Sequence, residues 1–222
     1  MSAVRRRVAF LHTSPAAVGP LMQYYNTAAP EFEVWNILED GILKFFSAGD
    51  YTSAEARLAT MVSAARSSYG AEAVMVTCSA VPLDLLGRLR TTAGVPLFKI
   101  DDPMARAAVQ AGSRIGVAVT FPPTLGPTTK LLEQSAADQG RTLDVVARVI
   151  PGAYDALLGG DTARHDELLI GGVEDLAREG VEAVVLAQVS MARVLPQLDG
   201  RLSVPVFSSL TSSLGELRRL MT

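Results

Sequence analysis

The only cysteine of the chain, Cys78, lies in the segment VMVTCSAVP at residues 74–82. The apolar residues before it are typical of a buried strand, and Pro82 fits the first turn of a following helix. A thiol at such a junction meets the positive end of the helix dipole and nearby N–H groups, which lower its pKa and favour the thiolate. Cys78 is therefore a candidate acid or base. The alternative is a small buried hydrophobic residue.

Hydroxyl and amide side chains stand at comparable positions, each just after an apolar run. With the N–H groups of the turns, they form a set of donors suited to a small carboxylate or an enediolate. The alternative is helix capping, which Ser and Thr perform routinely with the same groups. The predicted substrate-binding residues are Thr13, Ser14, Ser79, Thr120, Gln188 and Ser190.

The two histidines are weaker candidates. His12 stands near the end of an apolar run and is a candidate general base, but a core histidine with a satisfied hydrogen bond is the favoured interpretation. His165, in the charged segment DTARHDE, is expected at the surface. One cysteine and two histidines exclude internal disulfides, multi-cysteine zinc and iron–sulfur sites, and histidine-rich metal sites.

The composition excludes further classes of protein. The chain has 222 residues, 49% of them hydrophobic, and a net charge of −3, which disfavours a nucleic-acid-binding surface. No apolar run approaches the roughly 20 residues of a membrane span, and the run after Arg7 is too short for a signal peptide. A cytoplasmic location without membrane contact is therefore expected. No Gly-x-Gly-x-x-Gly follows the first apolar run, so dinucleotide binding lacks support.

Short runs rich in Val, Ile and Leu alternate with segments of helical period. Nearly every position of these runs is apolar, as in strands buried on both faces. The predicted strands are Val8–His12, Ala73–Thr77, Ile115–Thr120 and Ala183–Ala187, and the predicted helices are Ala54–Ser68, Thr128–Gln139 and His165–Arg178. This alternation predicts βαβ units and a mainly parallel sheet.

The two halves of the sequence resemble each other. Residues 8–20 align with residues 115–127 and share the pattern Thr-x-Pro-x-x-x-Gly-Pro. Two more matches follow in the same order, Glu72–Cys78 with Glu182–Gln188 and Val95–Phe98 with Val204–Phe207. A duplication predicts two similar α/β subdomains related by a pseudo-twofold. Because ligands of such sheets bind at the carboxyl ends of the strands, these ends are expected to meet in one shared cleft.

The length, the duplicated halves and two strand-end motifs resemble the aspartate/glutamate/hydantoin racemase superfamily, which includes arylmalonate decarboxylase and maleate isomerase. The motifs are Thr77-Cys78-Ser79-Ala80 and Leu186–Met191. The resemblance implies Rossmann-like or flavodoxin-like subdomains at residues 1–97 plus 208–222 and residues 98–207, with Ser212–Met221 as a returning helix. It also implies a small carboxylate substrate, no pyridoxal phosphate or metal, and homodimers as a common state.

Members of that family place one cysteine from each half on opposite sides of the substrate. One removes the α-proton, and the other reprotonates the opposite face. Cys78 matches the first cysteine, although Cys-Ser-Ala replaces the frequent Cys-Asn-Thr and Ala80 supplies no hydroxyl. Gln188 stands at the second position, and an amide cannot exchange a proton near neutral pH.

The resemblance and these departures predict a cofactor-independent isomerase of the racemase type with a single thiol. Cys78 would transfer a proton at the carbon next to the carboxylate of a small acid, and the second acid would be water or His12. Two alternatives stay open. The first is a lyase similar to arylmalonate decarboxylase, and the second is a non-catalytic relative that binds small anions.

Overall fold

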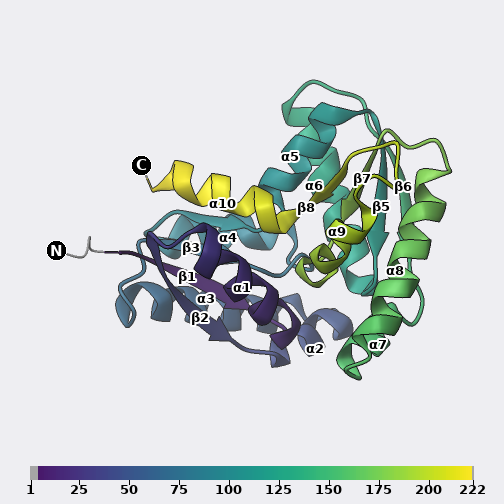
Figure 1. The fold of residues 1–222 in the computed structure, drawn as a ribbon. Helices are drawn as coiled ribbons and strands as arrows, with labels where there is room; N and C mark the ends of the chain where they lie inside the picture. Colours follow the sequence, from purple (N-terminus) through teal and green to yellow (C-terminus); the bar gives the residue numbers. More distant parts are fainter. Residues whose placement is uncertain (1–4, 222) are drawn as a thin grey trace. The chain divides into compact units, whose positions relative to one another are not determined.

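The computed structural model describes residues 5–221. By their internal contacts the residues form two units: unit 1 takes the chain up to Ile100 and resumes at Ser213, and unit 2 is Asp101–Ser212. Each unit has its own four-stranded sheet and its own helices (Figure 1). None of the helices in the described part is long and apolar enough to cross a membrane.

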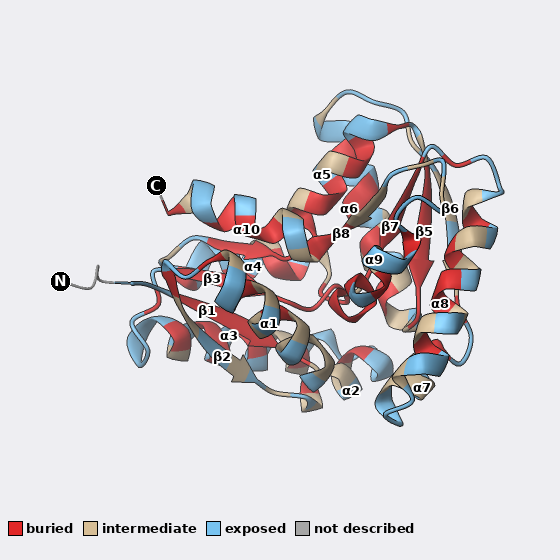
Figure 2. Cartoon of the chain, viewed as in Figure 1, coloured by how far each residue is buried: buried red, intermediate tan, exposed pale blue. Residues whose placement is uncertain are grey.

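The sheet of unit 1 has the strand order β2-β1-β3-β4, and all its neighbouring strands are parallel. The two central strands are buried because helices cover both faces of the sheet, whereas the edge strand β2 is partly exposed (Figure 2). The bounds of the strands are β1 (Arg6–His12), β2 (Phe32–Leu38), β3 (Ala73–Val76) and β4 (Leu97–Lys99).

Successive residues of β1 point to opposite faces of this sheet and meet different helices. Ala9 and Leu11 belong to one apolar cluster with α2, α3 and α4. On the other face, the ring of Phe10 packs edge-on against Tyr25 of α1, with centroids 4.8 Å apart, and the Tyr25 hydroxyl lies 3.0 Å from Ser213 Oγ of α10. The helices are η1 (Pro15–Ala17), α1 (Val18–Ala28), α2 (Gly41–Ala48), α3 (Tyr51–Ser67), α4 (Leu83–Ala93) and α10 (Ser209–Leu220), of which α10 belongs to unit 1 from Ser213 onward.

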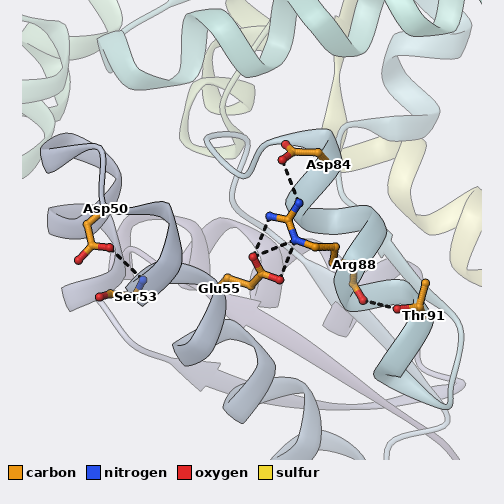
Figure 3. Close-up of polar contacts among 6 residues, drawn as sticks. All are labelled: Asp50, Ser53, Glu55, Asp84, Arg88 and Thr91. Carbon is orange, nitrogen blue, oxygen red and sulfur yellow. Dashed lines mark hydrogen bonds and ion pairs between the residues drawn. The ribbon is translucent and has the colours of Figure 1, made fainter.

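Charged residues at the surface link α3 to α4 (Figure 3). Arg88 donates to both carboxylate oxygens of Glu55 at 2.7–3.0 Å and to Asp84 at 3.1 Å. At the start of α3, the carboxylate of Asp50 accepts a hydrogen bond from the N–H of Ser53 at 3.0 Å and caps the helix. Since the Arg88 side chain is 52% exposed, its ion pairs are largely solvated and contribute little to stability.

Unit 2 repeats this plan with the strand order β6-β5-β7-β8, again parallel throughout. Ala118, Val184 and Leu186 of the central strands form one apolar cluster with α8 and α9, while α5 contacts β7, and α6 contacts β5 and β6. The strands are β5 (Arg114–Val119), β6 (Asp144–Val149), β7 (Ala183–Leu186) and β8 (Val206–Ser208). The helices are α5 (Asp102–Ala111), η2 (Pro122–Thr124), α6 (Leu125–Asp138), α7 (Ala153–Leu158), α8 (Thr162–Ala177), η3 (Val189–Val194) and α9 (Leu195–Leu198).

The two sheets have the same strand order, as the duplicated sequence predicts. The predicted α/β class with two mainly parallel sheets is confirmed. The four predicted strands coincide with the central strands β1, β3, β5 and β7 to within two residues. The edge strands β2 and β6 lie in segments for which the sequence pattern predicted no strand.

Candidate active site

The carboxyl edge of the unit 1 sheet brings Thr13 and Cys78 side by side. β1 and β3 are parallel neighbours with Leu11 opposite Val76, and the N–H of Thr77 donates to the Leu11 carbonyl at 3.0 Å. Thr13 and Cys78 each follow two residues after that pair, so they leave the sheet at the same level. Both are almost buried, with 2% and 8% of their surface exposed.

The loop after Cys78 carries backbone donors. The N–H of Val81 donates to the Cys78 carbonyl at 3.3 Å and closes a turn, and Pro82 takes the N-cap position of α4, one residue before the helix begins. Within residues 5–221, the N–H groups of Ser79 and Ala80 donate to no protein acceptor. Adjacent N–H groups in a turn are typical of concave stretches of backbone that bind an anion.

Ser14 caps the helix that follows β1. Its Oγ accepts a hydrogen bond from the N–H of Ala16 at 3.3 Å, so the capping role that the sequence left open is present here. Capping uses the oxygen as an acceptor and leaves the hydroxyl proton available to a ligand. Ser79, 6% exposed, lies next to Cys78 on the neighbouring loop.

His12 is fully buried, and both of its ring nitrogens are hydrogen-bonded. Nε2 lies 2.8 Å from Asn36 Oδ1 and Nδ1 lies 2.9 Å from Thr77 Oγ1. Since the amide oxygen can only accept, Nε2 carries the proton and Nδ1 is an acceptor. The single proton of the Thr77 hydroxyl is within reach of both Nδ1 and the Leu11 carbonyl, which lies 3.0 Å from Oγ1. Burial lowers the pKa of His12, although the bond to Asn36 opposes the shift. The interpretation of His12 as a core histidine with satisfied hydrogen bonds is confirmed.

At the matching edge of unit 2, the side chain of Gln188 binds the end of β5. Its Oε1 accepts hydrogen bonds from the N–H of Thr120 at 2.7 Å, the hydroxyl of Thr120 at 2.9 Å and the N–H of Phe121 at 3.2 Å. Three donors that converge on one oxygen are the arrangement that holds an oxyanion. Ser190 follows in η3 and is 7% exposed.

The prediction that His165 lies at the surface is wrong, because its side chain is fully buried. α8 begins at Thr162, three residues earlier than predicted, and His165 shares the buried stripe of this helix with Leu169. Its Nδ1 lies 2.8 Å from Asp166, which also pairs with Arg193 of η3 at 2.9 Å. The charged neighbours of His165 therefore bind one another and connect α8 to η3.

Lys99, which sequence reasoning did not select, also belongs to the edge of unit 1. It is the last residue of β4 and has no exposed surface. Its Nζ donates to the carbonyls of Ser79 at 3.3 Å and Val81 at 3.2 Å. The repeat could have drawn attention to Lys99, because the two halves differ at this position and the second half carries Ser208.

The predicted site residues thus form two groups. Thr13, Ser14, Cys78 and Ser79 belong to unit 1, whereas Thr120, Gln188 and Ser190 belong to unit 2. Their meeting in one shared cleft stays a prediction. Among residues 5–221, no three His, Cys, Asp or Glu side chains gather in a group that could hold a metal ion.

Several solved structures share this fold at low sequence identity. Glutamate racemase RacE1 of Bacillus anthracis superposes with a TM-score of 0.75 at 16% identity, over 97% of this chain and 81% of that one. Allantoin racemase of Klebsiella pneumoniae gives 0.71 at 20% identity, over 97% and 87% of the two chains. An arylmalonate decarboxylase gives 0.64 at 15% identity, over 96% and 92%. At these identities the likeness shows the fold alone.

The family assignment comes from the sequence. No curated protein matches the chain at a significant level. The family model described as Asp/Glu/Hydantoin racemase matches residues 26–215, which include most of both halves. The resemblance inferred from the strand-end motifs is thereby confirmed, and it supports an enzyme of the racemase type. The chain belongs to the Asp/Glu/hydantoin racemase family.

Proposed function

We propose that this chain is a cofactor-independent isomerase of the racemase type that acts on a small carboxylate through one thiol, Cys78. The observation that carries the proposal is the edge of unit 1. There Cys78 lies beside Thr13 and is followed by two N–H groups, of Ser79 and Ala80, that have no acceptor among the described residues. Membership of the family supports the racemase type of chemistry.

In the proposed reaction the thiolate of Cys78 takes the proton from the carbon next to the carboxylate. The electron pair of the broken C–H bond moves into the carboxylate and forms an enediolate. The N–H groups of Ser79 and Ala80 and the hydroxyl of Thr13 would stabilise the added negative charge. If Cys78 returns the proton to the same face, the starting isomer forms again, so inversion requires a proton from the opposite face.

We propose water as the donor of this second proton. Gln188 carries an amide that does not titrate near neutral pH, and its Oε1 already accepts three hydrogen bonds. His12, the other residue considered for this role, is fully buried and bonded through both ring nitrogens. Its lowered pKa also keeps the ring uncharged at neutral pH, so it has no spare proton to give.

A site with one thiol also suits the decarboxylation of a malonate-type acid, which is the second candidate. Loss of carbon dioxide leaves the electron pair of the broken C–C bond in an enediolate, and the Cys78 thiol then delivers one proton to the α-carbon. This reaction needs no second acid, so the amide at position 188 favours it. The fold likeness to an arylmalonate decarboxylase is compatible with it.

The proposal is tested by incubating the protein in deuterium oxide with single isomers of aspartate and glutamate and with an arylmalonate. Mass spectrometry measures deuterium at the α-carbon, and chiral chromatography measures inversion. We expect label to enter at least one acid, and Cys78→Ala to slow its entry by about 10²-fold or more, the usual contribution of a general acid or base.

The control is Thr91→Ala, a change at an exposed position of α4 in the same unit, which should leave the exchange unchanged. Release of carbon dioxide from the arylmalonate without exchange in the amino acids would select the decarboxylase. If label enters equally fast in wild type and Cys78→Ala, or enters no acid, the proposed proton transfer by Cys78 is wrong.

A further inference from the structure

Lys99 differs from the other lysines of the chain by its burial. The sequence contains three lysines, of which Lys44 and Lys130 are exposed, whereas Lys99 has no exposed surface. It ends β4 next to the site, with Val76 of β3 as its register partner, two residues before Cys78. A lysine is almost never fully buried unless its amino group has polar partners, so the contacts of Nζ indicate what the residue does.

The amino group of Lys99 holds the loop that follows Cys78. Nζ donates to the Ser79 carbonyl at 3.3 Å and to the Val81 carbonyl at 3.2 Å, so it joins the two sides of the turn around Ala80. The N–H of Val81 closes the same turn by donating to the Cys78 carbonyl. The conformation of the loop is therefore fixed from inside the protein.

The contacts of Lys99 also determine where the N–H of Ala80 points, because the peptide between Ser79 and Ala80 is planar and trans. In a trans peptide, the carbonyl and the N–H of the next residue point in opposite directions. Because the Ser79 carbonyl points to Lys99, the N–H of Ala80 must point away from Lys99. This N–H is one of the two that have no acceptor among the described residues.

We propose that Lys99 is the positioning residue of the Cys78 site, holding the Ser79–Ala80 peptide so that the Ala80 N–H is presented to an anion beside the thiol. The link to catalysis rests on the proposed function, because there the anion is the carboxylate that becomes the enediolate. The second half of the chain has Ser208 at the matching position, and its hydroxyl accepts from the N–H of Leu210 at 3.3 Å. The device is therefore confined to the half that carries the thiol.

The test compares two alkylating agents that differ in charge. Iodoacetate carries a carboxylate and iodoacetamide does not, and Cys78, the only cysteine, is the only thiol that either can modify. The ratio of their rate constants in folded protein, divided by the same ratio in urea-unfolded protein, measures how strongly the site guides an anion to the thiol. We expect this normalised ratio to exceed one in the wild type. Lys99→Met should lower it about tenfold, the effect of one misplaced hydrogen bond to a charged group.

The matched control is Lys44→Met, which removes an exposed lysine of the same unit and should leave the ratio unchanged. If Lys99→Met only loosens the fold, both rate constants change together and the normalised ratio stays at the wild-type value. That result would overturn the proposal. In Lys99→Gln the shorter side chain keeps an N–H donor, and we expect partial recovery of the ratio.

A second measurement needs no variant, in case Lys99→Met does not fold. Amide hydrogen exchange of the wild type should show the Val81 N–H protected as strongly as the amides of β3. Exchange as fast as that of an exposed loop would overturn the proposal. A lowered ratio in Lys99→Met, together with no deuterium uptake by any wild-type substrate mixture, would support the role of Lys99 and reject the proposed function.

Discussion

The two sheets have the same strand order, but the hydrogen-bond donors at their carboxyl edges differ in whether the chain itself supplies an acceptor. In unit 2, the end of β5 points three donors, from Thr120 and Phe121, at the side-chain oxygen of Gln188. In unit 1, the residue at the matching position is Cys78, and no described side chain takes the N–H groups of Thr13 and Ser14 in this way. The donors at the end of β5 in unit 2 are thus satisfied by a side chain of the same unit, whereas the matching N–H groups in unit 1 have no such acceptor among the described residues.

The difference shows how one residue can change the properties of a strand edge that is otherwise repeated in both units. Three donors at the end of β5 converge on the oxygen of Gln188. Unit 2 therefore shows directly how this edge can bind an oxygen atom. Unit 1 carries Cys78 at the matching position, and a thiol is a weak hydrogen-bond acceptor that can exchange a proton. Under the proposed function, unit 2 therefore contributes stability at this edge, and unit 1 contributes the thiol that transfers the proton.

The largest effect on stability is expected from removing the acceptor in unit 2. Gln188→Leu leaves three donors without a partner in a partly buried place, which should cost about 2–3 kcal/mol of unfolding free energy. Gln188→Glu keeps an oxygen at that place and should unfold at the same urea concentration as wild type or higher. Urea titration measures both, and equal losses in the two variants would show that the three hydrogen bonds do not stabilise the unit.

A smaller effect is expected at acid pH from His12 in unit 1. Its pKa is lowered by burial, so the unfolded chain takes up the proton at a higher pH than the folded one. The stability that neutral His12 contributes is fully present above pH 6.5. It is lost as the pH falls below that value, by up to about 1.4 kcal/mol per pH unit. In His12→Gln, the urea midpoint should fall less between pH 7 and pH 5.5 than in the wild type. The same dependence of the midpoint on pH in both proteins would contradict this assignment.

The smallest effect is expected from exposed ion pairs, one in each unit. Arg88→Ala removes the ion pairs of Arg88 with Glu55 of α3 and with Asp84 of α4 itself (Figure 3), and Arg164→Ala removes the pair with Glu167 in α8. Each should lower the midpoint of thermal unfolding by less than about 4 °C, because solvent screens both partners. A larger shift in only one variant would show that the two units depend differently on their surface charges.

The central strands could be predicted from the sequence because burial on both faces makes their residues uniformly apolar. The edge strand β2 carries Glu33 and Asn36, and β6 carries Arg148, since a strand at an edge meets solvent on part of its surface. Their mixed patterns resemble those of loops. The register and order of the strands then follow from pairing between distant segments, which no local pattern contains.

At the site, the sequence predicted positions but not partners. The repeat aligned Gln188 with Cys78, yet only the folded backbone shows that Oε1 accepts from the end of β5. The helix start was the weakest inference. Because Asp161 caps α8, the helix begins at Thr162, and this places His165 on the buried face. The burial of Lys99 depends on the path of the loop from Ser79 to Val81, which sequence patterns do not describe.

The assignment of the chemistry to unit 1 is tested most directly by deuterium uptake in two variants. Cys78→Ala removes the thiol at one edge, and Gln188→Glu changes the matching residue at the other edge while keeping its acceptor oxygen. With an acid that the wild type labels, we predict that Cys78→Ala loses α-carbon exchange by about 10²-fold or more and that Gln188→Glu keeps it within about threefold. Exchange that survives in Cys78→Ala and disappears in Gln188→Glu would contradict the assignment.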